Sequence, residues 1–117
     1  MNELLSKLSN KEFILTCLNL LHKAEKLTEK NINMLSDRDY CSGNFLCRFA
    51  ILSEVPVIGE IPRECYTDNT GHRRYYPEKY FIGEKAFIVT NHWYGPDKSN
   101  PDNRTPFMKW VINEIGL

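Results

Sequence analysis

The sequence predicts a small α+β domain in which two or three N-terminal helices precede a β-hairpin and a C-terminal helix. Three observations support this class. Apolar residues recur at helical spacing early in the chain, a glycine turn separates two β-rich runs, and an aromatic helical pattern ends at Gly116. The chain has 117 residues, about the length of one domain, so we expect residues 1–117 to form a single domain. This order of elements favours a winged-helix-like arrangement, although other small α+β folds share it.

Helical signals dominate the first part of the chain. Ser9 and Glu12 have the S-x-x-E form of a capping box, and the apolar residues after them follow one helical face to about residue 25. Residues 1–8 predict a short leading turn. Thr28 is a second N-cap, and the helix that it begins is expected to end near residue 36.

The middle of the chain predicts irregular structure. We expect a short helix or turn at 37–43, an apolar segment at 45–53 and a long loop at 54–74. One short strand is expected within that loop, around Val55 to Ile58. The loop assignment rests on the prolines and glycines at Pro56, Gly59, Pro62 and Gly71.

The hairpin is the clearest local pattern. Its two strands, Tyr75 to Ile82 and Lys85 to Asn91, flank Gly83 and Glu84. Glycine at the first central position is typical of a type II′ turn. Pro77 has no N–H to donate, so the first strand is expected at an edge of the sheet.

The last helix follows a polar loop at 95–103. We expect Thr105 to be its N-cap and Pro106 its first helical residue, and we expect the helix to end at Gly116.

A run of ring side chains stands where the hairpin ends. Because side chains alternate along a strand, Trp93 should point to one side and its neighbours His92 and Tyr94 to the other. We expect Trp93 to pack against Phe107 and Trp110 of the last helix, which leaves His92 and Tyr94 as an exposed pair.

Charge and hydropathy exclude several classes. The 15 basic and 15 acidic residues give a formal net charge of zero and are spread evenly, so the chain has no basic arm and at most a local basic patch. No apolar run approaches the roughly 20 residues that a membrane span needs, and we expect no signal peptide before the first helix. We therefore expect a cytoplasmic protein with no membrane partner, whose four cysteines stay reduced.

Metal binding and catalysis are not favoured by the spacing of the reactive residues. Cys41 and Cys47, and likewise Cys65 and His72, are further apart than the two cysteines of a zinc knuckle. Cys17 lies on an apolar helical face. The sequence contains no nucleophile elbow, phosphate-binding glycine loop or H-E-x-x-H motif. We expect no metal, no cofactor and no catalytic residues, while leaving open whether Cys41, Cys47, Cys65 and His72 converge.

Basic and aromatic residues alternate in GHRRYYPEKY, residues 71–80. Arginines pair with phosphates or guanine edges, and aromatic rings stack on bases, so this stretch is a candidate contact surface. The opposing interpretation is an edge strand whose tyrosines cover the core and whose charges are solvated. The candidate contact residues are Arg73, Arg74, Tyr75, Tyr76 and Lys79, joined by Lys85, His92, Tyr94 and Arg104, and by Lys98 and Lys109, if the hairpin and last helix share a face.

Two stretches, DRDYCSGNFLCRFAIL and RRYYPEKYFIGEKAFIVTNHWYG…NRTPFMKWV, resemble a pattern in small modules of phage and mobile-element proteins, some of which accompany restriction-type nucleases. The pattern is an acidic-aromatic-Cys turn, a glycine hairpin, an Asn-x-Trp, then Asn and a Phe-x-x-Trp helix. It is matched by Asp39, Tyr40, Cys41, Phe45, Tyr76, Gly83, Asn91, Trp93, Asn103, Phe107 and Trp110.

The resemblance implies a non-catalytic recognition module that acts where phage and host conflict. We therefore expect a nucleic-acid-associated module that binds DNA or RNA. The chain departs from the pattern in its neutral charge and in carrying no nuclease sequence. These departures keep an alternative open, which is a small phage-encoded inhibitor or adaptor that binds a host defence protein.

Overall fold

The structure is a computed structural model that describes residues 2–96 and 101–116. Within them, six helices accompany one three-stranded antiparallel sheet, which confirms the α+β class. The winged-helix-like arrangement within that class is not confirmed. The helices are α1 (Asn2–Ser6), α2 (Asn10–Lys23), α3 (Glu29–Leu35), α4 (Arg38–Phe45), α5 (Arg63–Tyr66) and α6 (Arg104–Ile115). The strands are β1 (Leu52–Val55), β2 (Tyr80–Ile82) and β3 (Lys85–Val89).

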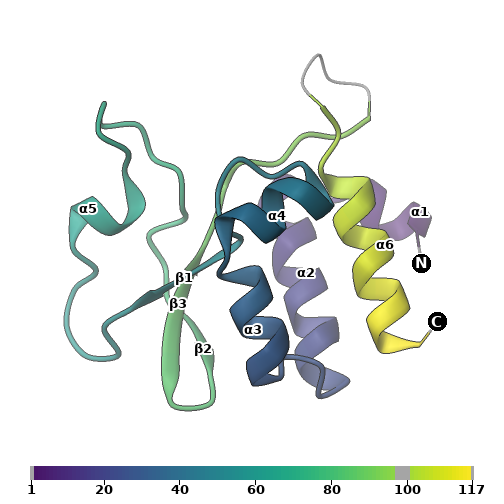
Figure 1. The fold of residues 1–117 in the computed structure, drawn as a ribbon, viewed down its shortest axis with the longest axis horizontal. Coiled ribbons are helices and arrows are strands. Elements are labelled where there is room, and N and C mark those ends of the chain that lie inside the picture. Colours follow the sequence, from purple (N-terminus) through teal and green to yellow (C-terminus); the bar gives the residue numbers. More distant parts are fainter. Residues whose placement is uncertain (1, 97–100, 117) are drawn as a thin grey trace.

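The sheet divides the apolar side chains into two groups, as Figure 1 makes visible. All the helices except α5 lie on one side of the sheet, and α5 with its flanking loops lies on the other. The larger core joins the first group of helices to the side chains of Leu52, Phe87 and Val89. The smaller core contains Val55, Ala86 and Ile88 on the opposite face of the sheet. β3 is the central strand of the sheet and carries buried apolar residues on both faces.

Side-chain caps fix the beginnings of three helices. The capping box of α2 is confirmed, with the Glu12 amide donating to Ser9 Oγ at 3.3 Å and the Ser9 amide donating to a Glu12 carboxylate oxygen at 3.4 Å. Thr28 caps α3 as predicted. Asp37 caps α4, which is a helix rather than a turn and extends to Phe45. These local bonds satisfy amides that have no acceptor inside the helix.

The hairpin is confirmed, with shorter strands than predicted. Ile82 pairs with Lys85, and Gly83 has a φ of +60° while Glu84 does not have a positive φ, as a type II′ turn requires. The sheet order β1-β3-β2 places the first hairpin strand at an edge, also as predicted. Between residues 75 and 79 the ladder is reduced to an isolated bridge from Tyr75 to Thr90. Pro77, which lacks an amide donor, lies in this gap.

The prediction of a long loop at 54–74 is partly wrong. Its strand lies earlier, at Leu52–Val55, because Leu52 and Val55 are both buried while Pro56 directly after them cannot donate to a ladder. The loop also contains the unpredicted helix α5 (Arg63–Tyr66). A single helical turn is too short to show a hydrophobic periodicity.

The predicted start of the last helix is also corrected. The α6 helix begins at Arg104, and the amides of Arg104 and Thr105 both donate to Asp102 Oδ1 at 3.0 Å. Thr105 is therefore not the N-cap, and Pro106 is the third helical residue. Proline is tolerated there because the first-turn amides have no acceptor within the helix. Gly116 ends the helix with a φ of +83°, as expected.

Aromatic packing joins α2, α4 and α6. Trp93 is buried, with its ring centroid 5.4 Å from that of Phe107 and 5.7 Å from that of Phe13. Trp110 lies instead on Phe107 and Phe45, at 6.0 and 5.7 Å. The predicted contact of Trp93 with Phe107 is confirmed, whereas the rings that Trp110 contacts are those of Phe107 and of Phe45 on α4, not that of Trp93.

Of the helices in residues 2–96 and 101–116, none combines the length and the apolar character that crossing a membrane requires.

Candidate contact surface

The segment from His92 to Tyr94 is held by two buried side chains, those of Asn103 and Trp93. Asn103 is 1% exposed, donates from Nδ2 to the His92 carbonyl at 2.8 Å and accepts the Tyr94 amide on Oδ1 at 2.8 Å. Trp93 points into the core and donates from Nε1 to the Thr90 carbonyl at 2.8 Å. These bonds hold His92 and Tyr94 on either side of an anchored tryptophan.

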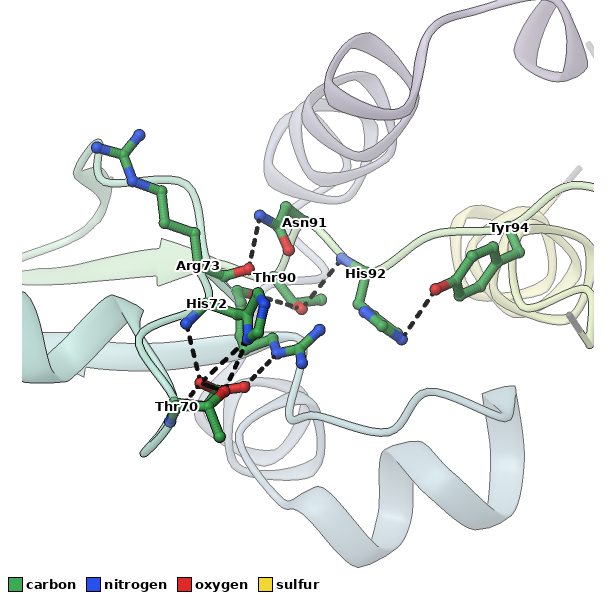
Figure 2. A network of polar contacts seen from close by, with 9 residues as sticks. Thr70, His72, Arg73, Thr90, Asn91, His92 and Tyr94 are labelled. Atoms are coloured by element: carbon green, nitrogen blue, oxygen red, sulfur yellow. Dashed lines mark hydrogen bonds and ion pairs between the residues drawn. The ribbon is translucent and has the colours of Figure 1, made fainter.

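The His92 and Tyr94 rings contact each other. Tyr94 Oη and His92 Nε2 are 3.2 Å apart, and the two ring centroids are 5.0 Å apart, nearly perpendicular (Figure 2). His92 also meets Phe49 edge-on, with centroids 5.2 Å apart. Both His92 and Tyr94 are half-buried rather than exposed, which corrects the prediction of a free surface pair.

Two arginines complete what we call the Phe49 cluster, which consists of Arg48, Phe49, Arg74, His92 and Tyr94. The Arg74 and Arg48 guanidinium carbons lie 5.4 and 5.9 Å from the centre of the Phe49 ring. Burial lowers the pKa of His92 below its ordinary value of 6.5, and the positive charges of Arg74 and Arg48 lower it further. The cluster thus gathers cationic and aromatic groups from three separate segments.

A tight turn beside the cluster positions Arg74. Asp68 accepts hydrogen bonds from Thr70, from the His72 amide at 3.0 Å and from Arg74 Nε at 2.8 Å. The Thr70 hydroxyl first, and then the Arg74 guanidinium and neighbouring amides, hold the pKa of Asp68 well below its usual range. Figure 2 shows Thr70 and His72 at this turn. Arg74 is therefore partly neutralised by its own ion pair.

Arg73 is placed differently from its neighbour. Its carbonyl accepts a hydrogen bond from Asn91 Nδ2 at 3.3 Å, while its side chain extends away from the network in Figure 2. The guanidinium lies over the Tyr66 ring at 5.5 Å and remains exposed. Arg73 thus presents its charge to solvent.

The two tyrosines of the predicted surface belong mainly to the core. Tyr75 donates its hydroxyl to the Ala50 carbonyl at 2.7 Å, and burial raises its pKa to about 12. Tyr76 packs on the larger core, with Lys11 Nζ over its ring at 5.6 Å. Their aromatic faces therefore cover the protein interior.

The remaining predicted cations do not join the Phe49 cluster. Lys79 Nζ donates to the carbonyls of Val57 and Gly59 at 2.9 and 2.7 Å. Arg104 lies over the ring of Phe13, away from the hairpin. Lys85 is exposed at the hairpin turn and Lys109 on α6, whereas Lys98 lies outside the described residues.

Arg48 and Phe49 were missed by the sequence analysis. They lie in LCRFAIL, residues 46–52, which was interpreted only as an apolar segment. The available signal was an arginine inside an otherwise apolar run, where a charged residue must reach the surface. That Phe49 meets His92 is decided by tertiary packing.

The cysteines lie on both sides of the sheet. Cys17, Cys41 and Cys47 are buried in the larger core, and burial raises their pKa values to about 12, 11 and 12. Cys65 is partly exposed and packs on the smaller core. Among residues 2–96 and 101–116, no three His, Cys, Asp or Glu side chains are grouped to hold a metal ion.

Comparison with known proteins reveals no relative. No family model matches the chain, and neither a curated protein nor a solved structure is significantly similar to it. The resemblance to phage modules therefore stays a prediction from the residues.

Proposed function

We propose that this protein is a non-catalytic, nucleic-acid-associated recognition module of a phage or mobile element, and that it acts in the cytoplasm through the Phe49 cluster. The observation that carries the proposal is the convergence of Arg48 and Arg74 on the Phe49 ring beside His92. Cations with interleaved aromatic rings suit a strand whose phosphates need neutralising and whose bases can stack.

Two arginines without ion pairs among the described residues, Arg48 in the cluster and Arg73 next to Arg74 in the chain, support contact with phosphate. Arg48 has no ion-pair partner in the part of the chain that the structure describes, and neither has the exposed Arg73. Each can therefore pair with an incoming phosphate without losing an internal bond. His92, with its lowered pKa, is mainly neutral near pH 7 and can offer a hydrogen bond to a base or phosphate.

The test is a titration of the protein with mixed-sequence DNA or RNA, both as duplex and as single strands, at two salt concentrations. We expect affinity to fall with salt, with a slope of about 0.9 per neutralised duplex phosphate. Arg48→Ala combined with Arg73→Ala should weaken binding and reduce the slope by up to ~2. Arg74 is left intact because its ion pair with Asp68 shapes the turn.

Lys85→Ala combined with Lys109→Ala is the matched control, since it also removes two exposed positive charges, one at the hairpin turn and one on α6. It should leave most of the slope in place. The proposal fails if neither duplex nor single-stranded nucleic acid binds at low salt, where surface electrostatics are strongest. Equal slopes for the two double variants would also contradict it.

One observation favours the alternative of an inhibitor or adaptor that binds a host defence protein. Val57, Ile58 and Phe81 are 47%, 89% and 52% exposed, respectively. Phe81 is on the edge strand β2, opposite Ala86, and Lys79 ties the loop at residues 57–59 close to that strand. Exposed apolar side chains beside an open strand edge are typical of protein contacts.

This alternative is tested by pull-down from host lysate. A single retained host protein that is lost on Phe81→Ser, together with no strand binding at low salt, would replace the nucleic-acid proposal. Glu84→Ser is the matched control, because Glu84 is exposed in the same hairpin but is not apolar. Retention by the Phe81→Ser protein would count against the alternative.

A further inference from the structure

A pocket of about 420 Å³ lies where α1, α2 and the start of α6 meet the segment at residues 93–96. Its volume is within the range of roughly 300–1,000 Å³ that small-molecule sites occupy. The lining residues that matter here are Phe13, Trp93, Tyr94, Arg104, Thr105 and Met108. The pocket therefore has an aromatic and apolar wall and one cation.

Arg104 is held rigidly in this wall. Its guanidinium carbon is 4.4 Å from the centre of the Phe13 ring, Nη1 donates to Asn10 Oδ1 at 3.1 Å, and Nη2 donates to the Leu5 carbonyl at 2.9 Å. These two bonds leave other N–H groups of the guanidinium for a ligand. A cation fixed in advance loses little entropy when it binds an anion.

The charge of Arg104 is not balanced by an ion pair within the described residues. Burial lowers its pKa, and the nearby Asp102 carboxylate offsets this effect only in part, so the surroundings still disfavour the positive charge. An anion in the pocket would offset that cost, since a buried charge is stabilised by a hydrogen-bonded partner. The neighbouring Thr105 hydroxyl is a second group that can donate to the same anion.

We propose that this pocket binds one nucleotide, with its phosphate on Arg104 and Thr105 and its base against the wall formed by Phe13, Trp93 and Met108. Tyr94 connects the pocket to the Phe49 cluster, because it lines the pocket while its hydroxyl lies 3.2 Å from His92 Nε2. The inference rests on the proposed function, in which a strand held on the cluster places one of its nucleotides here.

The experiment is a titration with the four nucleoside 5′-monophosphates, followed by tryptophan fluorescence. A Trp110→Phe background leaves Trp93, which lines the pocket, as the reporter, since the sequence has two tryptophans. We expect saturable binding of at least one monophosphate. The matching nucleoside, ribose 5-phosphate and inorganic phosphate should each bind at least ~10-fold more weakly, because each lacks one half of the recognised chemistry.

Arg104→Met should reduce monophosphate affinity by ~10-fold or more. Because Arg104 also braces Leu5 and Asn10, Thr105→Val serves as a second variant, which keeps the side-chain shape and removes only the hydroxyl. It should weaken binding several-fold. Lys109→Ala is the control, as it removes an exposed positive charge from the same helix outside the pocket.

The outcomes separate the pocket from the cluster. No saturable monophosphate binding, or binding that survives both Arg104→Met and Thr105→Val, would overturn the pocket assignment. Strands that bind normally while monophosphates do not would overturn the pocket alone. Monophosphates that bind while no strand does would support the pocket and overturn the proposed function.

Discussion

At the scale of single residues, Asn103 helps to fix the position of the candidate surface. Its side chain pairs the part-buried backbone groups of His92 and Tyr94, which belong to no helix or strand. No buried side-chain nitrogen or oxygen among the described residues lacks a partner. An asparagine satisfies both groups because its amide carries a donor and an acceptor together.

Replacing Asn103 with alanine should destabilise the fold by about 2–3 kcal/mol, because two part-buried backbone groups would lose their partners and the buried Asn103 side chain would be removed. The measurement is the urea midpoint. Asn91→Ala is the control, since Asn91 makes one longer bond to the Arg73 carbonyl near the surface and should cost under ~1 kcal/mol. Similar midpoints for the two variants would show that Asn103 does not hold the segment.

His92 predicts a pH dependence of stability. Its pKa is lowered in the folded state, so the unfolded chain binds the proton more tightly. The contribution of His92 to the unfolding free energy is therefore fully present above the unfolded pKa of about 6.5. It is lost as the pH falls through that value toward the folded pKa.

The check is a series of urea unfolding curves between pH 8 and pH 5, compared with those of His92→Gln. The unfolding free energy of the wild type should fall more steeply over this range than that of the variant. Parallel curves would mean that His92 titrates as it does in the unfolded chain.

At the scale of elements, the hairpin depends on its turn. Gly83 has a φ of +60°, a conformation in which a Cβ is strained even though no atom lies within 4 Å of the place where it would stand. The strain would therefore come from the backbone alone. A short edge strand of three residues has few other bonds to hold its register.

Gly83→Val should lower the unfolding free energy by ~1 kcal/mol or more. Gly43→Ala is the matched control, because Gly43 lies inside α4 without a positive φ and with equally open surroundings. That substitution should stabilise by about 0.5–1 kcal/mol through helix propensity. Destabilisation of both variants by the same amount would point away from the turn conformation.

At the scale of the whole molecule, the sheet separates two cores of unequal size, and the four cysteines are distributed between them. Three cysteines are inside the larger core, where burial raises their pKa values to between about 11 and about 12. Cys65 lies on the smaller core and is partly exposed. Thiolate is the reactive form, so the buried thiols are protected both sterically and by their pKa.

A thiol reagent at pH 8 should therefore modify one cysteine of the native protein quickly and the other three only on unfolding. Cys65→Ser should abolish the fast phase without changing the slow one. Rapid modification of two or more thiols in the folded protein would mean that the larger core opens readily.

The sequence by itself determined the α+β class, the capped helices α2 and α3 and the glycine turn. These features depend on neighbours in the chain or on a periodic pattern, so their physical cause is local. The helix α5 and the position of β1 did not follow, because each is too short for its pattern to be distinguished from a loop.

Only the tertiary structure decided which cationic side chains lie close together. Arg74, His92 and Tyr94 were foreseen, yet their partners Arg48 and Phe49 come from a segment that looked purely apolar. Arg104 was expected beside the hairpin and instead lines a pocket over Phe13. Side-chain contacts between distant segments are set by how the helices pack on the sheet, and no spacing along a single chain encodes that geometry directly.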